Sequence, residues 1–359
     1  MKEKAIIAMS GGVDSAVAAL LTSQMGFECM GVTMKLFYDE DLIEEEQREN
    51  SCCSLSDVED ARSVATLLEM RHYVFNFSDK FRSCVIDPFV SDYENGRTPN
   101  PCIDCNRHLK FDKLYQRARE LGFDRVVTGH YARIEYDEAR GWYLLKKAVD
   151  ETKDQSYVLY SMTAEQLAHT LFPLGAYRKT EVRDIAASHG FVNARKHDSQ
   201  DICFVQNGTY ADFIKQYTGK SYPGGDFVDV DGNVLGHHKG IIYYTVGQHK
   251  GLGISSDIPW YVKEVRPEDN TVVLARNEEL FTNECIADRV NLISVDRIDT
   301  PMRVTAKVRY RQKEQPATVT QDENGRLHIV FDEPQRAITR GQAAVLYDGD
   351  IVVGGGTIV

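Results

Sequence analysis

The residues best suited to do chemistry form the run Ala8-Met9-Ser10-Gly11-Gly12-Val13-Asp14-Ser15. An apolar segment before the glycines predicts a buried strand, and the apolar segment 16–21 predicts a helix that ends near Gly26. The glycine N–H groups, the serine hydroxyls and the helix N-terminus together favour a bound anion. Asp14 is suited to bind Mg²⁺. The run lacks the Gly-Lys-Ser/Thr ending of a Walker loop, so it predicts another kind of phosphate loop or a plain glycine-rich turn.

Cysteines offer the second candidate chemistry. Cys102 and Cys105 follow a proline-rich segment at 99–101, and the sequence predicts a helix that begins near Cys105 or Asn106. A thiol at a helix N-terminus with basic residues nearby is expected to be nucleophilic, with a lowered pKa. The alternative for Cys-x-x-Cys is half of a structural zinc site. The chain's other close pair, Cys52-Cys53, has poor spacing for the second half.

The order of predicted elements indicates an α/β protein. Strands alternate with helices through the first half, which predicts a parallel sheet with helices on both faces and a nucleotide site at the carboxyl ends of its strands. A strand over 125–130 would bring Gly129 to that edge, and a further helix is predicted over 180–190. From about residue 210, short β-rich runs and glycine turns predict a small central domain and a β-barrel. The expected domains are 1–205, 206–276 and 277–359.

Composition sets further limits. The chain has 359 residues and a formal charge of −12, which argues against nucleic-acid binding through bulk charge but leaves room for a local basic surface. It shows neither a run of membrane-spanning length nor a signal peptide, so we expect a cytoplasmic protein without a membrane partner. One basic run stands out, because residues 302–313 alternate apolar and cationic side chains. It predicts a strand that shows five cations to RNA phosphates, or else an ordinary solvated strand face.

The glycine run Ser10–Ser15 resembles the pyrophosphate loop of the ATP-pyrophosphatases, which cleave ATP between the α- and β-phosphates and adenylate a carbonyl oxygen. Other motifs follow in the same order along nearly the whole chain. Together with the loop they resemble the tRNA-specific 2-thiouridylases. These motifs are Asn100-Pro101-x-x-x-Cys105-Asn106, Lys153-Asp154-Gln155-Ser156-Tyr157, Asp198-Ser199-x-x-Ile202-Cys203-Phe204, Gly247-Gln248-x-Lys250-Gly251-Leu252-Gly253 and Arg309-Tyr310-Arg311-Gln312.

The resemblance implies a reaction. ATP adenylates O2 of uridine 34, the wobble uridine of tRNAs for Lys, Glu and Gln, and a persulfide on Cys203 delivers sulfur to C2. Cys105 attacks the persulfide and can be left in a disulfide with Cys203, while AMP and pyrophosphate are released. The implied partners are tRNA and a sulfur donor, either a cysteine desulfurase or a relay protein. The implied fold is a nucleotide-binding α/β domain, a small central domain and a C-terminal β-barrel.

The resemblance also implies site residues. Residues 8–15 with Met34 and Gly129 would bind ATP, and Asn100, Pro101 and Cys102 would hold the target base. The tRNA contacts would be Lys153, Asp154, Gln155, Arg309 and Tyr310. Many family members carry Asp at the position of Cys102, where a carboxylate has been proposed as general acid/base. A thiol stands there in this chain, so the resemblance does not assign Cys102 that role.

Three alternatives remain open. Cys102, Cys105 and Cys203 would suit a [4Fe–4S] cluster with an open fourth position, and a ligated Cys203 could not carry a persulfide. The chain could instead be another ATP-pyrophosphatase, such as an amidotransferase-type synthetase or an argininosuccinate-type ligase, which needs neither Cys105 nor Cys203. It could also be a non-catalytic RNA-binding protein that keeps a nucleotide fold.

Overall fold

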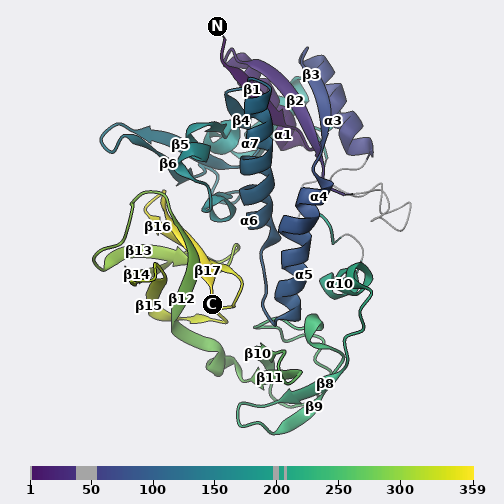
Figure 1. The fold of residues 1–359 in the computed structure, drawn as a ribbon, viewed down its shortest axis with the longest axis vertical. Coiled ribbons are helices and arrows are strands. Elements are labelled where there is room, and N and C mark those ends of the chain that lie inside the picture. Colours follow the sequence, from purple (N-terminus) through teal and green to yellow (C-terminus); the bar gives the residue numbers. More distant parts are fainter. Residues whose placement is uncertain (1, 38–54, 197–201, 206–207) are drawn as a thin grey trace. The chain divides into compact units, whose positions relative to one another are not determined.

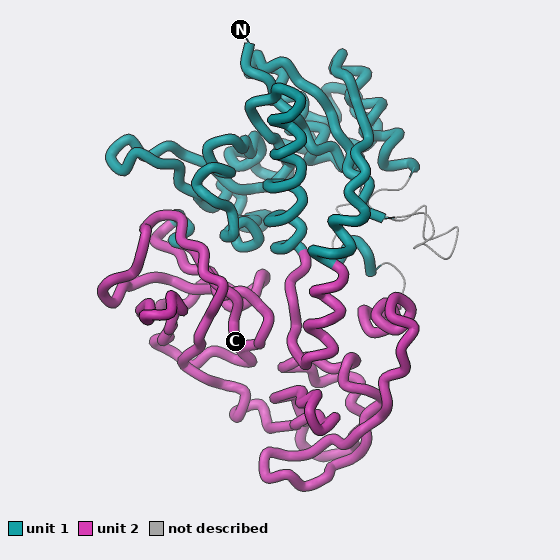
Figure 2. The backbone as a smooth tube through the Cα atoms, in the orientation of Figure 1, with its two compact units in different colours: residues 1–85, 102–207, 350–353 teal, residues 86–101, 208–349, 354–359 magenta. Residues whose placement is uncertain are grey.

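The computed structural model describes residues 2–37, 55–196, 202–205 and 208–359. Cys52-Cys53 and most of the motif before Cys203 therefore lie outside the described residues. The chain folds into two compact units (Figure 2). Unit 1 comprises residues 1–85, 102–207 and 350–353, and unit 2 comprises residues 86–101, 208–349 and 354–359. No helix in the described ranges is both long and apolar enough to cross a membrane.

A parallel sheet forms the centre of unit 1 (Figure 1). Its strand order is β3-β2-β1-β4-β7, and each neighbouring pair is parallel, as the alternation of strands and helices predicted. The strands are β1 (Lys4–Ala8), β2 (Glu28–Lys35), β3 (Arg71–Asn76), β4 (Arg125–Val127) and β7 (Thr170–Leu171). The predicted strand 125–130 is too long, because β4 ends at Val127 and leaves Gly129 and His130 in the loop beyond it.

Helices cover this sheet. Helices α1 (Val13–Gln24), α3 (Leu55–Leu67) and α9 (Lys179–Ser188) pack with one face of β1 in a single apolar cluster that includes Ala5 and Ile7. Ile6 points to the opposite face because strand side chains alternate, and it is also fully buried. Helix α7 (Leu114–Glu120) contacts β4. Burial on both faces is what a parallel sheet requires.

The cysteine helix begins earlier than the sequence predicted. Helix α6 (Pro101–Cys105) continues as the π-helical η3 (Asn106–Lys113) and then as α7. Pro101 is therefore the first helical residue, a position where its missing N–H costs nothing. The remaining elements of unit 1 are α4 (Ser78–Phe81), the hairpin β5 (Ala132–Asp137) and β6 (Trp142–Lys147), η4 (Ser156–Leu159), α8 (Ala164–Ala168) and η5 (Pro173–Ala176).

Unit 2 contains a small mixed sheet with the order β10-β11-β8-β9. Its strands are β8 (Gly225–Val228), β9 (Val234–His238), β10 (Tyr261–Arg266) and β11 (Thr271–Ala275). Two helices of this unit, α5 (Asp87–Glu94) and α10 (Tyr210–Thr218), meet through stacked rings of Tyr93 and Tyr210, 4.5 Å apart. Short helical turns lie at η6 (Ile241–Tyr243) and η7 (Asn277–Leu280), and η2 (Arg82–Ile86) precedes α5.

The C-terminal part is a closed six-stranded β-barrel, as predicted. The strand order is β12-β15-β14-β13-β16-β17, and pairing of β12 with β17 closes it. The strands are β12 (Phe281–Leu292), β13 (Met302–Lys307), β14 (Gln315–Gln321), β15 (Leu327–Arg336), β16 (Ala343–Asp348) and β17 (Ile351–Ile358). The predicted strand through residue 313 is wrong, because the chain turns after Lys307 and the Gln312 side chain accepts a hydrogen bond from Val308 N at 3.2 Å.

Candidate active site

The glycine loop between β1 and α1 is shaped to receive an anion. Gly11 has φ +75°, and a Cβ there would lie 2.5 Å from the Asp57 carbonyl oxygen, so only glycine fits without strain. Ser15 Oγ donates to Gly12 O at 2.9 Å and accepts from Ser10 N at 3.2 Å. Gly12 is the N-cap of α1 and has no side chain to satisfy the first N–H groups of the helix. The N–H groups at the start of α1 therefore remain available to a ligand.

Two other residues predicted to bind nucleotide lie at the same sheet edge. A Cβ on Gly129 would come within 2.8 Å of backbone atoms of Asp14 and Ser15, so the loop after β4 backs onto the first turn of α1. Met34 lies on β2, two residues beyond Val32, which pairs with Ala8 at the end of β1. The arrangement agrees with a nucleotide site at the carboxyl ends of the strands. Adenine contacts by Met34 and Gly129 stay a prediction.

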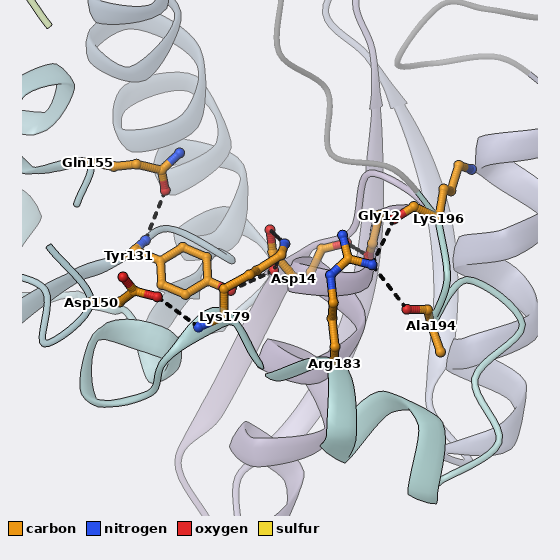
Figure 3. Close-up of polar contacts among 10 residues, drawn as sticks. Gly12, Asp14, Tyr131, Asp150, Gln155, Lys179, Arg183, Ala194 and Lys196 are labelled. Carbon is orange, nitrogen blue, oxygen red and sulfur yellow. Dashed lines mark hydrogen bonds and ion pairs between the residues drawn. The ribbon is translucent and has the colours of Figure 1, made fainter. Parts of the chain in front are cut away.

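Asp14 is held by two partners from distant parts of unit 1 (Figure 3). Lys179 Nζ donates to both carboxylate oxygens at 2.7 Å, and Tyr131 OH donates to Oδ1 at 2.7 Å. Lys179 is itself nearly buried, with 8% of its surface exposed, and its backbone N–H donates to Asp150. The predicted magnesium ligand is therefore already neutralised by an ammonium group beside the phosphate loop.

Sequence reasoning missed Lys179. The predicted helix was expected to begin at Thr180, but α9 begins at Lys179 with Arg178 as its N-cap. Cations at a helix N-terminus oppose the helix dipole, so two basic residues in succession there are unusual. That conflict was the available signal, because it calls for an anionic partner from elsewhere in the fold.

A second set of contacts holds the segment after α9 against the loop, and the contacts made by Arg183 are drawn in Figure 3. Asn193, only 2% exposed, donates from Nδ2 to Gly11 O at 3.0 Å. Lys196 Nζ forms ion pairs with Asp57 at 2.7 Å and Asp60 at 2.6 Å, and Arg183 donates to the carbonyls of Ala194 and Lys196. These contacts fix the chain just before the segment that leads to Cys203.

His130 is a buried neutral histidine next to the loop. Burial, followed by the charge of Lys110, lowers the pKa of His130 well below its usual value. Lys110 Nζ lies 3.3 Å from Nε2, and a protonated amine can only donate, so Nε2 accepts and Nδ1 carries the hydrogen. Nδ1 then donates to Thr128 Oγ1 at 2.7 Å. The contacts thus define one tautomer of His130.

The three candidate cysteines are all in unit 1. Cys102 is exposed in the first turn of α6, Cys105 is half-buried one turn further on, and Cys203 is half-buried in a turn. The expectation that a helix begins near Cys105 or Asn106 is wrong, since α6 begins at Pro101 and Cys102 lies in its first turn. Phe204, the neighbour of Cys203, is buried against Phe81 with ring centroids 5.8 Å apart. The Cys203 turn is therefore anchored to unit 1 by an aromatic contact.

The described residues do not form a metal site of the cluster type. Among residues 2–37, 55–196, 202–205 and 208–359, no group of three or more His, Cys, Asp or Glu side chains is arranged to hold a metal ion. The iron–sulfur alternative and the zinc alternative for these cysteines stay predictions. Asp14 remains a chemically suitable ligand for Mg²⁺, which commonly takes one or two protein carboxylates together with substrate phosphates.

Comparison with known proteins identifies the family. Residues 3–207 match a family model described as the tRNA methyl transferase HUP domain, residues 211–276 its PRC-barrel domain, and residues 282–358 an aminomethyltransferase β-barrel domain. The tRNA-specific 2-thiouridylase MnmA of Clostridioides difficile strain 630 is 54% identical over 358 residues, 100% of this chain and 98% of that protein. The chain belongs to the tRNA-specific 2-thiouridylase family.

A second relative agrees with this assignment. The family member from Acetivibrio thermocellus is 50% identical over 359 residues, covering 99% of both chains. Among solved structures, a 4-thiouridine synthetase in complex with RNA and bound ATP is similar at a TM-score of 0.38, with 19% identity over 60% of this chain and 50% of that chain.

In this 2-thiouridylase-family chain, the predicted tRNA-contacting triplet Lys153-Asp154-Gln155 forms a braced loop. Asp154 accepts from Ala148 N at 3.0 Å and from Ser156 Oγ at 2.7 Å. Gln155 Oε1 accepts from Tyr131 N at 2.9 Å, and Gln155 N donates to Tyr131 O at 2.8 Å (Figure 3). The loop is thus tied to the residue whose hydroxyl binds Asp14. Its contact with tRNA stays a prediction.

The predicted contacts Arg309 and Tyr310 lie in the turn after β13. Arg309 Nη2 donates to Val246 O at 3.1 Å, to Ala337 O at 2.8 Å and to Thr339 Oγ1 at 2.8 Å. Arg309 therefore joins the barrel to the loop before β10, both within unit 2. Tyr310 has 38% of its surface exposed. Nearer the start of β13, Arg303 pairs with Asp332 of β15 in a two-pronged ion pair at 2.8 and 2.7 Å.

Proposed function

We propose that this protein is a tRNA-uridine 2-sulfurtransferase that uses ATP to convert uridine 34 of tRNAs for Lys, Glu and Gln to 2-thiouridine. Support comes from relatives that are tRNA-specific 2-thiouridylases and match the whole chain at about half of all positions. The observation that carries the proposal is the loop at residues 10–15, whose uncapped helix N-terminus lies beside the Asp14–Lys179 pair. We also propose that the protein is located in the cytoplasm.

The loop residues supply positive potential where phosphate charge collects. The first N–H groups of α1 would bind the phosphates of ATP, and Lys179 would contribute the ammonium charge that a Walker loop carries within its own sequence. Preorganised donors of this kind stabilise charge that develops on a leaving group. Where ATP carries Mg²⁺, Asp14 would hold the ion, which neutralises phosphate charge. Asp14 also orients Lys179, since the ammonium group bonds both of its oxygens.

Adenylation solves the chemical difficulty of the reaction. O2 of uracil is an amide-like oxygen and a poor leaving group. Its attack on the α-phosphate of ATP expels pyrophosphate and makes the oxygen part of AMP, which departs readily. Asn100, Pro101 and Cys102 would hold the base, which must leave the anticodon stack to reach a protein site.

Sulfur transfer is assigned to Cys203 and Cys105. The terminal sulfur of a Cys203 persulfide attacks C2, and Cys105 then attacks Cys203 Sγ, so that a Cys105–Cys203 disulfide forms as the sulfur is transferred and AMP departs. A sulfur donor, either a cysteine desulfurase or a relay protein, would recharge Cys203 after reduction.

The test is a reconstituted reaction with unmodified tRNA for Lys, ATP and a persulfide donor. Wild-type protein should form 2-thiouridine and release pyrophosphate only when tRNA is present. Cys203→Ser should form no 2-thiouridine yet keep tRNA-dependent pyrophosphate release, because adenylation precedes sulfur transfer. Cys84→Ser, which changes another half-buried cysteine of unit 1, is the matched control and should behave like wild type.

Other outcomes identify the alternatives. Activity on another substrate that survives replacement of both Cys105 and Cys203 would indicate a different ATP-pyrophosphatase. Binding of tRNA without pyrophosphate release would indicate a non-catalytic RNA-binding protein. Iron and acid-labile sulfide measured after anaerobic purification of wild type and Cys102→Ala would reveal a cluster if about four irons per chain were present and lost in the variant.

A further inference from the structure

The proposed function does not use the glycine motif Gly247–Gly253, which the structure places before β10 in unit 2 (Figure 1). The start of the motif is rigidly built. Gly247 N donates to Val262 O at 2.7 Å, and Val262 N donates to Gln248 O at 2.9 Å. Gln248 also braces the turn, because Oε1 accepts from Thr245 N at 3.1 Å and Nε2 donates to Lys250 O at 3.0 Å. The motif therefore shapes a fixed loop base.

Beyond that base, residues of the loop line an open pocket of about 220 Å³. Its lining includes His249, Leu252, Ile254 and Trp260. Leu252 is 7% exposed and belongs to the apolar core of the small sheet, and Ile254 and Trp260 pack at the edge of that core. The volume is below the ~300–1,000 Å³ of pockets for drug-sized ligands, so it suits a single planar ring.

Aromatic rings and arginines lie together around this open pocket. The Arg276 guanidinium lies 3.6 Å from the Trp260 ring centroid, and the carbonyls of Ile258 and Pro259 hold it there at 2.5 and 3.4 Å. The His249 ring lies 5.0 Å from that of Tyr261, and its Nδ1 donates to Trp260 O at 3.0 Å. Arg336 lies 4.9 Å over the Tyr261 ring. Two cation–π pairs thus flank the loop.

These features match the chemistry of an unpaired nucleotide. Aromatic faces stack on nucleobases of any identity, and arginines attract the phosphates next to them. Between Gly247 and Trp260 the sequence contains one lysine and one aspartate, so the positive charge comes from Arg276 and Arg336. Glu278 and Glu279 follow Arg276 in η7, and Glu279 Oε2 accepts from Arg276 N at 2.7 Å. The arginines therefore offer local donors to a phosphate, and the surrounding surface carries both signs of charge.

We propose that the open pocket between residues 249 and 260 is a nucleobase pocket, in which Trp260 stacks on one unpaired base of the substrate tRNA. This inference rests on the proposed function for the identity of the RNA, and it adds a contact point remote in sequence from every residue predicted to bind tRNA. His249 Nδ1 already donates to Trp260 O, so Nε2 is the ring nitrogen that would meet the edge of the base.

The direct test uses tryptophan fluorescence. The chain has two tryptophans, Trp142 and Trp260. Trp142 Nε1 is buried without a hydrogen-bond partner in the described structure, so Trp142→Phe removes no bond there and leaves Trp260 as the sole emitter. Titration with unmodified tRNA should quench the emission saturably, and a blunt duplex RNA of similar length should not. Absence of quenching by tRNA, or equal quenching by the duplex, overturns the pocket.

Substitution provides the second readout. Trp260→Ala should raise the KM for tRNA roughly 5- to 150-fold, the effect of losing one stacked base, and Trp260→Phe should restore most of it. Tyr136→Ala, which removes an exposed aromatic ring of unit 1, is the control and should leave the KM for tRNA as in the parent. An unchanged KM for tRNA in folded Trp260→Ala overturns the proposal, as does a defect confined to sulfur loading from a donor protein.

The two proposals fail in different ways. If wild-type protein forms no 2-thiouridine, the proposed function is wrong, and the tRNA titration of Trp260 still decides whether an RNA base enters the pocket. If 2-thiouridine forms and Trp260 does not respond to tRNA, only the pocket is wrong.

Discussion

Two ion pairs with the same 2.7 Å separation lie in very different surroundings. Lys179 reaches Asp14 beside the phosphate loop at 2.7 Å, and Arg303 reaches Asp332 on the barrel at 2.7 Å. The first pair has side chains 10% and 30% exposed, whereas the second has 60% and 47%. Water screens the exposed pair and hardly reaches the ammonium group of the buried one. Burial, and not the distance between the charged groups, therefore indicates which ion pair contributes more to stability and function.

The largest effect is expected at Lys179. Lys179→Met should lower the kcat of tRNA-dependent pyrophosphate release about 100- to 1,000-fold, since one preorganised charge at a reacting centre contributes that much. Pyrophosphate release measured under saturating ATP and tRNA checks this. Lys146→Met is the matched control, because Lys146 is 16% exposed and pairs with Glu135 and Asp350 elsewhere in unit 1.

A folding defect can be separated from a catalytic one. Lys179→Met leaves the Asp14 carboxylate without its cation, which destabilises a partly buried pair. Adding Asp14→Asn removes that charge, so the double variant should recover stability in urea, and the urea midpoints of the single and double variants show how far unfolding accounts for the loss in Lys179→Met. Recovery of activity in the double variant would show that Lys179 serves the fold and not the phosphates.

His130, a second buried group beside the glycine loop, should make the stability of the protein depend on pH. Burial and the charge of Lys110 hold the pKa of His130 well below its usual value in the folded protein. At acidic pH the unfolded chain therefore binds a proton at His130 that the folded chain does not bind. Stability is therefore complete above about pH 6.5 and should fall by up to ~1.4 kcal/mol for each pH unit below it. Urea midpoints at pH 7.5, 6.5 and 5.5 measure the slope.

A neutral substitute isolates this contribution. His130→Gln cannot be protonated and should flatten the acid side of the stability curve. His189→Gln, at an exposed histidine of the same unit, should leave the wild-type slope. An equal slope in wild type and His130→Gln would mean that other groups cause the acid instability.

The same contrast explains what the sequence could predict. The strand–loop–helix unit at residues 4–24 follows from local pattern, because the glycines, the apolar strand and the apolar helix are contiguous. The barrel, too, follows from short β-rich runs between turns. Lys179 could not be found in this way, since it lies 165 positions from Asp14 and only the fold brings them together. Cys105 was misplaced by one helical turn, because Pro101 begins the helix and does not merely precede it.

The predicted strand over residues 302–313, with five cations on one face, is wrong for a related reason. Alternation of apolar and cationic residues with a period of two is a local signal. In the sequence this alternation runs to residue 313, but the strand ends earlier, where the Gln312 side chain bonds to Val308 N. The ion pair with Asp332 could not be predicted either, since Asp332 lies 29 positions from Arg303 in sequence and is brought near it by strand pairing. Absence of acidic residues within a run therefore says little about the charge of the surface it joins.

The smallest effect is accordingly expected at Arg303. Asp332 already binds its guanidinium at two points, so Arg303→Ala should change tRNA affinity less than about twofold, within what exposed surface pairs contribute. Asp332→Ala should do more, because it frees a cation on the barrel face. If that cation meets a phosphate, log K for tRNA should fall with log salt more steeply by about 0.9, the slope of one added contact. Binding isotherms at several salt concentrations measure both variants. A large loss of tRNA affinity in Arg303→Ala, with a shallower salt dependence, would instead mean that an RNA phosphate displaces Asp332 from Arg303. The exposure that makes this ion pair weak would then also allow RNA to replace one of its partners.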